Sequence, residues 1–254
     1  DDYADMSAYF EAKLSLFRRD RARFAVISLD SAAGRQLTEH CDVPYATVLT
    51  PAIAADPSQD TDWIVDIIEE GRSGVVFRLS HRDGRTLQTH VPVIGSHMAA
   101  NAGLALVMLL HASRTWERLV TVFDGGRINA HLPGRTQLVS GESGPAVYVD
   151  FGHSADAFEK TLAAVRHVTP GKVLMLFGAD GDRDDTKRIE MGRAAAEGSD
   201  IVVITDHHPR REDPDGIRRT LVAGARHARP AGQIHEHSPP ERAIIEAVRL
   251  VGPG

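Results

Sequence analysis

The second half of the chain alternates short apolar runs with stretches of helical spacing. The apolar runs are rich in Val, Ile and Leu and lie at 146–149, 173–177, 201–205 and 233–235. Runs of this length and composition are typical of buried strands. A stretch of helical spacing follows each run, at 155–167, 186–197, 215–227 and 240–251. Strands that alternate with helices predict an α/β fold with a mainly parallel sheet and right-handed crossovers.

The first half of the chain carries a less regular series of elements. Its best hairpin signal lies in 75–95, where apolar and polar residues alternate on both sides of Asp83-Gly84. A buried strand is predicted at 24–29 and helices at 7–17, 33–40, 98–113 and 115–123, the first of them capped by Ser7.

Residues 129–135 interrupt this pattern with Pro133 and Gly134, which are typical of a connection between domains. We therefore expect one domain in residues 1–132 and a second in 133–254. The chain begins immediately before a helical pattern, and it stops in a Gly-Pro-Gly turn that should lead into another strand. We expect it to be a fragment of a longer protein.

The composition excludes several classes of protein. Of the 254 residues, 42% are hydrophobic and 25% are charged, and the net charge is -6 without a basic block. Nucleic acid is therefore excluded as the main partner. A single cysteine, Cys41, rules out an internal disulfide and is typical of a reducing compartment. Because no stretch has the length of a membrane span, a cytoplasmic protein is expected.

Unusual polar residues follow each predicted strand of the second half. They lie at 150–153, 178–183, 206–210 and 235–237. In parallel sheets, ligands bind beyond the carboxyl ends of the strands. The sequence therefore predicts a functional site along one edge of this sheet.

The triplet Asp150-Phe151-Gly152 matches the one with which protein kinases hold magnesium. A kinase also needs a Gly-rich loop, a strand lysine and a His-Arg-Asp loop, and the sequence contains none of these before the triplet. The sequence also lacks a P-loop with Gly-Lys-Ser/Thr. The match is therefore attributed to chance.

Two loops have more than one interpretation. Residues 178–188 either cradle an anion at the start of the next helix or form a solvated acidic turn that caps it. His207 and His208, together with His235 and His237, could form a zinc site or have surface roles, since their spacing is not characteristic of zinc sites.

Three single residues are further candidates. Arg210 follows a proline at a strand end and suits a carboxylate clamp, because a guanidinium binds carboxylate in bidentate fashion. Lys13 is, by composition alone, a solvated helix lysine. Asn101 lies in the most apolar helix, where a buried amide needs hydrogen-bond partners, so that ligand binding competes with a capping or packing role.

Taken in order along the chain, these segments resemble the Mur ligases of peptidoglycan synthesis, specifically the MurE type. "YFEAK" (9–13) is similar to the segment whose lysine, here Lys13, is carbamylated and helps to hold magnesium. "GSHMAAN" (95–101) resembles Gly-x-(Phe/His)-Asn-x-x-Asn, and Asn101 matches its nucleotide-contacting Asn. Met98 replaces the first Asn of that motif.

The resemblance continues in the second half. "LPGR" (132–135) is similar to the hinge that carries an ATP-contacting arginine, here Arg135. "VDFGHSADA" (149–157) resembles Val-Asp-Tyr-Ala-His-Thr-Pro-Asp-Ala. This similarity implies that Asp150 meets the ribose region of ATP and His153 the phosphate side.

Two further motifs concern the incoming amino acid. "GDRDDTKR" (181–188) resembles the loop whose arginine, here Arg183, contacts that amino acid. "HHPR" (207–210) stands where the meso-diaminopimelate enzymes carry Asp-Asn-Pro-Arg. Arg210 is thus retained, and His208 replaces the Asn that helps to grip the substrate.

The family resemblance implies a fold and an activity. Residues 1–132 would be the later part of a central ATP-binding domain, and 133–254 a C-terminal Rossmann-like domain without its last segment. The implied reaction uses ATP and Mg²⁺ to add a diamino acid, with meso-diaminopimelate favoured, to UDP-N-acetylmuramoyl-L-Ala-D-Glu through an acyl phosphate. The family implies a monomer with small-molecule substrates.

Two alternatives stay open. Because the P-loop is missing from these residues, the polypeptide alone is expected to be inactive. It could also belong to a non-catalytic relative that binds nucleotide or amino acid. A closer enzyme alternative is another Mur ligase or a folylpolyglutamate synthetase.

Overall fold

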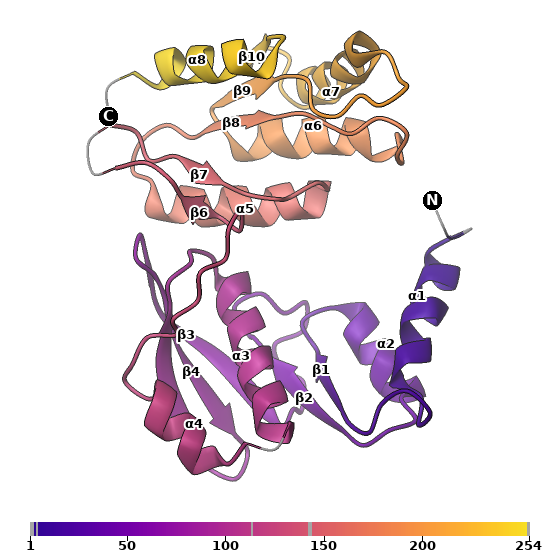
Figure 1. Ribbon diagram of the computed structural model, residues 1–254, viewed down its shortest axis with the longest axis vertical. Coiled ribbons are helices and arrows are strands. Elements are labelled where there is room, and N and C mark those ends of the chain that lie inside the picture. Colours follow the sequence, from indigo (N-terminus) through magenta and orange to yellow (C-terminus); the bar gives the residue numbers. More distant parts are fainter. Residues whose placement is uncertain (1–2, 4, 113, 142–143, 253–254) are drawn as a thin grey trace. The chain divides into compact units, whose positions relative to one another are not determined.

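The computed structural model describes residue 3 and residues 5–112, 114–141 and 144–252. The chain forms two compact units, with the boundary between residues 131 and 132 (Figure 1). The end residues Asp1-Asp2 and Pro253-Gly254, which entered the expectation of a fragment, lie outside the described residues.

The first unit is built on a five-stranded sheet with the order β1-β2-β3-β4-β5. The strands are β1 (Ala25–Ser28), β2 (Tyr45–Leu49), β3 (Trp63–Gly71), β4 (Gly74–His81) and β5 (Thr86–Val91). The first three are parallel to one another, and β4 is antiparallel to both β3 and β5. The hairpin predicted around Asp83-Gly84 is confirmed, and Gly84 supplies the positive φ of its turn, +94°.

Four α-helices of the first unit are described. They are α1 (Met6–Leu14), α2 (Ala32–His40), α3 (Ser96–His111) and α4 (Trp116–Phe123), and a short 3-10 turn, η1 (Ser15–Phe17), follows α1. Helix α3 approaches the sheet closely at Gly103, where an added methyl group would lie 2.4 Å from Val65 Cγ2. Around this contact Trp63 and Phe77 are fully buried in the core.

The cap predicted for the first helix is wrong. Helix α1 begins at Met6, and its N-cap is Asp5, whose carboxylate accepts a hydrogen bond of 2.8 Å from the amide of Ala8. An N-cap residue needs an extended backbone, which Asp5 has at φ -159° and ψ 178°. Ser7 already lies inside the helix and cannot fill this role.

The second unit contains a three-stranded parallel sheet with the order β10-β9-β8. Its strands are β8 (Leu174–Phe177), β9 (Ile201–Ile204) and β10 (Gln233–Glu236). The helices of this unit are α5 (Ala155–Val168), α6 (Lys187–Gly198), α7 (Pro214–Ala228) and α8 (Pro240–Val251). The alternation of strands and helices predicted for this half is confirmed.

Helices cover both faces of this parallel sheet. Val202 and Ile204 of β9 belong to the core formed with α5, α6 and α7. Ile201 and Val203 point to the other face and pack against α8, where Ala243 is fully buried. Figure 1 shows α8 on one side of the sheet and α6 on the other. A strand buried on both faces reads as a continuous apolar run, which explains why β9 was recognisable in the sequence.

One predicted strand does not join the parallel sheet. The run at 146–149 yields a two-residue strand, β7 (Tyr148–Val149), which pairs antiparallel with β6 (Gln137–Leu138). Next to this pair, the Val139 amide donates to the Val147 carbonyl over 2.9 Å. The prediction that the residues after this strand share one sheet edge with the other loops is therefore wrong.

Two glycines bring helices α6 and α7 into close contact. A methyl group on Gly192 would lie 2.1 Å from the carbonyl oxygen of Leu221, and one on Gly224 would lie 2.1 Å from that of Ile189. Both distances are far below van der Waals contact, so each position accepts only glycine without a shift of the backbone.

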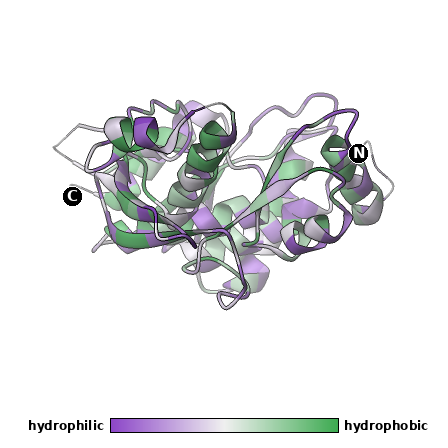
Figure 2. Cartoon of the chain, turned by 90° about the horizontal axis from the view of Figure 1, so that it is seen from below, coloured by the Kyte–Doolittle hydropathy of each residue, from purple (hydrophilic) through white to green (hydrophobic). Residues whose placement is uncertain are grey.

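Hydropathy follows this layered arrangement. In Figure 2, helices carry hydrophobic and hydrophilic stretches side by side, as expected for helices that cover a sheet with one face. No helix in the described part of the chain combines the length and the hydropathy that a membrane span requires.

Candidate functional site

Two loops leave the carboxyl ends of neighbouring parallel strands. The β8–α6 loop (178–186) follows β8, and the β9–α7 loop (205–213) follows β9. The amide of Gly181 donates a hydrogen bond of 2.8 Å to the carbonyl oxygen of His208. A methyl group on Gly181 would lie 1.9 Å from the carbonyl oxygen of Pro209, so the loops are in direct backbone contact. The position of each loop is therefore fixed by its contact with the other.

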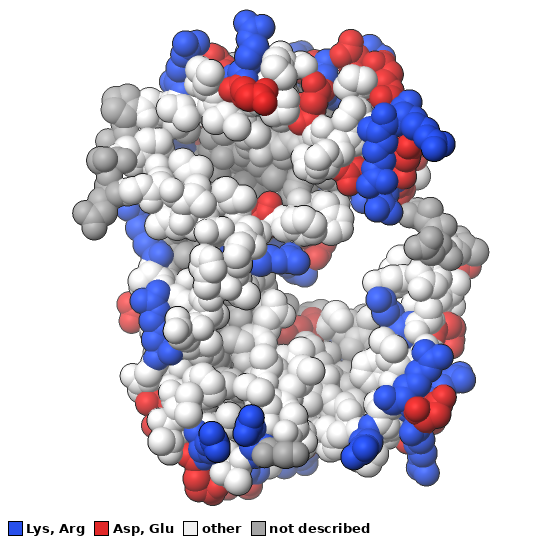
Figure 3. All heavy atoms as spheres, in the orientation of Figure 1, with Lys and Arg blue, Asp and Glu red and all other residues white. Residues whose placement is uncertain are grey.

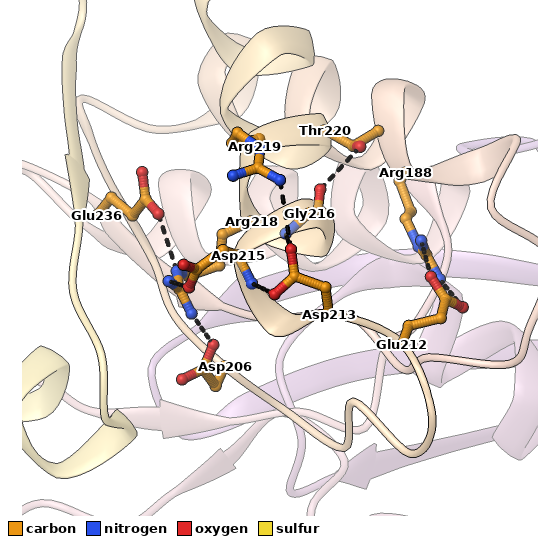
Figure 4. A network of polar contacts seen from close by, with 10 residues as sticks. All are labelled: Arg188, Asp206, Glu212, Asp213, Asp215, Gly216, Arg218, Arg219, Thr220 and Glu236. Carbon is orange, nitrogen blue, oxygen red and sulfur yellow. Dashed lines mark hydrogen bonds and ion pairs between the residues drawn. The ribbon is translucent and has the colours of Figure 1, made fainter.

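An ion pair made by a buried arginine reinforces this contact (Figure 4). Arg188, in the first turn of α6, donates to both carboxylate oxygens of Glu212 over 2.8 and 2.9 Å, and its side chain is only 5% exposed. The same guanidinium donates to the carbonyl oxygen of Asp180 over 3.0 Å. Glu212 also accepts from the amide of Asp182 over 2.6 Å. These hydrogen bonds, first those from Arg188, lower the pKa of Glu212 to about 2.

Asp180 joins the two loops through its side chain. Its Oδ1 is 2.7 Å from Nδ1 of His207, and its Oδ2 is 3.9 Å from a terminal nitrogen of Arg210. Burial acts to raise the pKa of Asp180. The hydrogen bond from His207 and the positive charge of Arg210 outweigh this effect and hold the pKa below its ordinary value.

A second buried arginine ties the neighbouring strand ends together. Arg218 of α7 pairs with Asp206 at the end of β9, with Asp215 in its own helix and, over 2.8 Å, with Glu236 at the end of β10 (Figure 4). The hydroxyl of Ser238 donates to the other oxygen of Asp206 over 2.5 Å. The base of the β9–α7 loop is thus held from two strands.

The three residues expected to contact an amino acid lie on these loops. Arg183 is exposed, and its side chain forms no hydrogen bond or ion pair with the described residues. His208 is exposed, and its ring meets the ring of His207 edge to face at 4.3 Å. Arg210 has the left-handed φ of +53°. The structure brings their loops together but shows no direct contact between Arg183 and Arg210.

A second group of expected residues gathers around Phe151. The Arg135 guanidinium lies over the Phe151 ring at 5.4 Å, and the His153 ring meets it at 5.8 Å. Asp150 accepts from the amide and the hydroxyl of Thr136 over 2.8 and 3.1 Å. Phe151 is 66% exposed, which is unusual for a large aromatic side chain. Arg135, Asp150 and His153 therefore form one local cluster.

The remaining two expected residues belong to the first unit. Lys13 is exposed near the end of α1, and its Nζ lies 5.2 Å from the centre of the Tyr9 ring. Asn101 is exposed on α3, so the expectation that its amide is buried is wrong. The buried face of α3 is formed instead by neighbours such as Ala99 and Gly103. Because the Asn101 side chain is exposed, it has no packing role in the core and is accessible to a ligand.

The alternative interpretations of the loops can also be compared with the structure. Within the described ranges, no group of three or more His, Cys, Asp or Glu side chains is arranged to hold a metal ion, including His207, His208, His235 and His237. The N-cap of α6 is Thr186, whose side chain makes no cap hydrogen bond. Of the two interpretations left open for 178–188, the acidic cap on α6 is not observed: Asp184 instead accepts from the Thr186 amide and hydroxyl.

Surface charge and surface shape were also compared with the expected site residues. Figure 3 shows Lys and Arg interspersed with Asp and Glu on the visible face of each unit. A shallow groove of about 360 Å³ lies between α5 and α6, where residues such as Leu162, Ala163 and Arg166 line it. It contains none of the expected site residues.

Sequence reasoning did not identify the residues that hold the two loops in place. Asp180 lies in the segment 178–188 and His207 in the motif "HHPR", but nothing in the sequence indicated that they pair. Arg188 and Glu212 are separated by 23 residues, and each looks like an ordinary surface charge. Gly181 is compatible with the contact between the loops, since glycine lets the backbone approach another segment closely.

The family matches follow the two units. Residues 1–109 match the family described as Mur ligase middle domain, and residues 134–254 match the one described as Mur ligase, glutamate ligase domain. The chain belongs to the Mur ligase family. The predicted resemblance is thereby confirmed.

Relatives of this Mur ligase chain carry MurE-type names. It is 46% identical over 256 residues to UDP-N-acetylmuramyl-tripeptide synthetase of Leifsonia xyli subsp. xyli, covering 100% of this chain and 49% of that relative. It is 34% identical over 256 residues to UDP-N-acetylmuramoyl-L-alanyl-D-glutamate--2,6-diaminopimelate ligase of Streptomyces avermitilis, covering 99% and 49%. The chain spans about half the length of these curated relatives.

Solved structures share the fold of this Mur ligase chain. One is a UDP-N-acetylmuramoyl-L-alanyl-D-glutamate--2,6-diaminopimelate ligase, 25% identical with a TM-score of 0.55, covering 96% of this chain and 49% of that one. Another is folylpolyglutamate synthase of Mycobacterium tuberculosis complexed with ADP, 19% identical with a TM-score of 0.71, covering 99% and 53%. The second similarity concerns the fold alone.

Proposed function

We propose that this chain is part of an ATP-dependent amide-bond ligase of peptidoglycan synthesis. The reaction adds a diamino acid to UDP-N-acetylmuramoyl-L-Ala-D-Glu. The names of the relatives support this reaction, and the two joined loops support it from the structure. Lying beyond the carboxyl ends of β8 and β9, they occupy the place where ligands bind in open parallel sheets.

The observation that carries the proposal is the backbone contact between Gly181 and His208. It places the loop of Arg183 next to the loop of His208 and Arg210. All three side chains are exposed, so they are accessible to a small molecule. A site with two guanidinium groups suits a substrate with carboxylates, since each guanidinium forms charge-assisted hydrogen bonds with such a group.

The cluster around Phe151 is proposed to contact ATP. Asp150 is oriented by its hydrogen bonds to Thr136 and Gly152, and its carboxylate keeps lone pairs that can accept from ribose hydroxyls. His153 and Arg135 would lie toward the phosphates, where their donors and charge suit anionic oxygens. Asn101 of α3 is proposed as a nucleotide contact through its exposed amide.

Magnesium is proposed to be held in part by Lys13. An ammonium cannot bind a cation, so this residue fits the metal only as a carbamate, whose oxygens are the ligands Mg²⁺ prefers. The exposure of Lys13 makes its amine accessible to carbon dioxide, and no described carboxylate pairs with it. When bound, Mg²⁺ would neutralise charge on the phosphate oxygens.

The chemistry requires activation of a carboxylate, which is a poor acyl donor. Transfer of the γ-phosphoryl group of ATP to the substrate carboxylate gives an acyl phosphate and ADP. The amine of the diamino acid then loses a proton and attacks the carbonyl carbon, so that a C–N bond forms and phosphate leaves. The part of the two loops is to hold this amine in line with the carbonyl carbon.

Among diamino acids we favour meso-diaminopimelate. Its side chain ends in a carboxylate, which Arg210 can bind in bidentate fashion. The His208 ring, when it is protonated, also disfavours a side chain that ends in an ammonium alone. Arg210 and His208 therefore both favour meso-diaminopimelate over diamino acids without a distal carboxylate.

The test is a comparison of kcat/KM for meso-diaminopimelate, L-lysine and L-ornithine, measured on the protein in its full natural length. Arg210→Ala should lower the value for meso-diaminopimelate by about tenfold or more and leave lysine largely unaffected. Arg211→Ala is the matched control, because it removes the same charge from the exposed neighbouring position. A preference of the wild type for lysine, or indifference to Arg210→Ala, would refute the carboxylate clamp.

A further inference from the structure

Asp180 is the one acidic side chain that faces both His207 and Arg210 among the described residues. Its position is unusually well fixed for a loop residue. The buried guanidinium of Arg188 holds its carbonyl oxygen over 3.0 Å, and His207 holds Oδ1 over 2.7 Å. The next residue, Gly181, is bonded to the opposite loop. The carboxylate is therefore held in place before any substrate arrives.

The contact between Asp180 and Arg210 is loose by comparison. At 3.9 Å it lies at the outer limit of an ion pair, and the two side chains are 34% and 43% exposed. Pairs of this kind contribute little to stability, because water competes for both charges. They can separate at small cost when a ligand offers a better partner to each. Oδ2 of Asp180 and the guanidinium of Arg210 are both open to such an exchange.

We propose that Asp180 binds the side-chain ammonium of the diamino acid, while Arg210 binds the carboxylate beside it. The far end of meso-diaminopimelate is a zwitterion, with one ammonium and one carboxylate on the same carbon. Asp180 and Arg210 likewise present one carboxylate and one guanidinium, of opposite charge. The pair is complementary to such an end in the sign and the spacing of its charges.

This inference rests on the proposed function of the two loops, and it adds a specificity-determining residue to them. Arg210 distinguishes substrates by the presence of a distal carboxylate. Asp180 distinguishes them by the presence of a distal ammonium, which every diamino acid has and a simple dicarboxylic amino acid lacks. Together the two residues account for both groups of the distal end.

The roles of Asp180 and Arg210 are tested in the full-length ligase by measuring kcat/KM of each variant with three substrates. The substrates are meso-diaminopimelate, L-lysine, which lacks the distal carboxylate, and 2-aminopimelate, which lacks the distal amine. Asp180→Asn keeps an oxygen for His207 and removes the charge. It should lower kcat/KM for the first two by about tenfold and leave 2-aminopimelate unchanged. Arg210→Ala should have the complementary pattern, with lysine the unaffected substrate.

Asp182→Asn is the matched control. It makes the same chemical change two residues away, at a φ of +50° that Asn tolerates. The Asp182 side chain has no hydrogen-bond or ion-pair partner among the described residues, so all three substrates should keep their wild-type values. If Asp180→Asn lowers all three substrates equally, its effect is on folding of the loop and the proposal is overturned. An unchanged profile would overturn it as well.

A binding measurement separates this inference from the proposed reaction. L-lysine is titrated into the 254-residue chain and into its Asp180→Asn variant, and amide NMR shifts are followed at 178–183 and 206–210. Shifts in the wild type that disappear in Asp180→Asn support the ammonium site even if no turnover is found. Equal shifts in both chains, or none in the wild type, would overturn it.

Discussion

Asp150 holds Thr136 in a backbone conformation that a β-branched residue rarely adopts. Thr136 has φ +43° and is almost fully buried, and both its amide and its hydroxyl donate to Oδ2 of Asp150. Left-handed backbone is strained for threonine because its branched Cβ crowds the carbonyl oxygen. The two hydrogen bonds offset this strain at the turn that follows Pro133-Gly134.

The hydroxyl of Thr136 should therefore matter more than its methyl group. We expect Thr136→Val to lower the free energy of unfolding of the 254-residue chain by about 1 kcal/mol, because one hydrogen bond to Asp150 is lost. Thr136→Ser keeps the hydroxyl and should stay within about 0.5 kcal/mol of the wild type. Urea unfolding followed by circular dichroism measures both. Equal destabilisation by the two variants would show that the methyl group dominates.

The contact between α6 and α7 should not tolerate even one methyl group. Gly192→Ala places Cβ against the backbone of Leu221, so we expect a loss of about 1–3 kcal/mol in the free energy of unfolding. Gly171→Ala is the control, because nothing lies within 4 Å of the added atom there. Thermal unfolding of the two variants gives the comparison. A Gly192→Ala chain as stable as the control would contradict the close packing.

The pair formed by Arg188 and Glu212 should make the chain less stable in acid. The pKa of Glu212 is lowered from 4.5 to about 2 in the folded chain, first by its hydrogen bonds to Arg188. A depressed pKa stabilises the fold fully above pH 4.5, and this contribution is lost as the pH falls toward about 2. We expect the difference in unfolding free energy between wild type and Glu212→Gln to shrink over this range. Urea titrations at several pH values measure it, and a constant difference would argue against the ionised pair.

The metal role of Lys13 predicts a large effect on turnover. In the full-length ligase, Lys13→Ala should lower kcat by roughly a hundredfold or more, because the proposed carbamate ligand is lost. Added short carboxylic acids should restore part of the activity by supplying the missing oxygens. Lys160→Ala is the control, since Lys160 forms only an exposed pair with Asp156. Phosphate release reports both variants, and a wild-type rate for Lys13→Ala would exclude the role.

The sequence predicts elements well where burial leaves a clear pattern. Strand β9 is apolar at every position because both its faces are covered, and it was predicted almost to the residue. Strand β3 was not predicted. Its pattern of exposure changes where Ile67 gives way to the exposed Glu69, at a bulge opposite β4. There the alternation that marks a strand is lost.

Some features of the candidate site could likewise be predicted from the sequence, and others could not. The loops of Arg183 and Arg210 could be placed at strand ends, because the order of strands and helices determines which ends carry polar residues. The pairing of Asp180 with His207 could not, because it depends on the conformation of two loops. A side-chain contact between residues 27 positions apart leaves no local pattern in one sequence.

The close backbone contact at Gly181 also affects how the substrate preference of this site can be changed by exchanging loops with a relative. The backbone of Gly181 rests directly on that of Pro209, so each loop is shaped to the other. A graft that brings in the β8–α6 loop of a relative without its β9–α7 loop would combine surfaces that never adapted to each other. Exchanges of amino acid preference between such ligases should therefore succeed only when both loops are transferred as a single cassette.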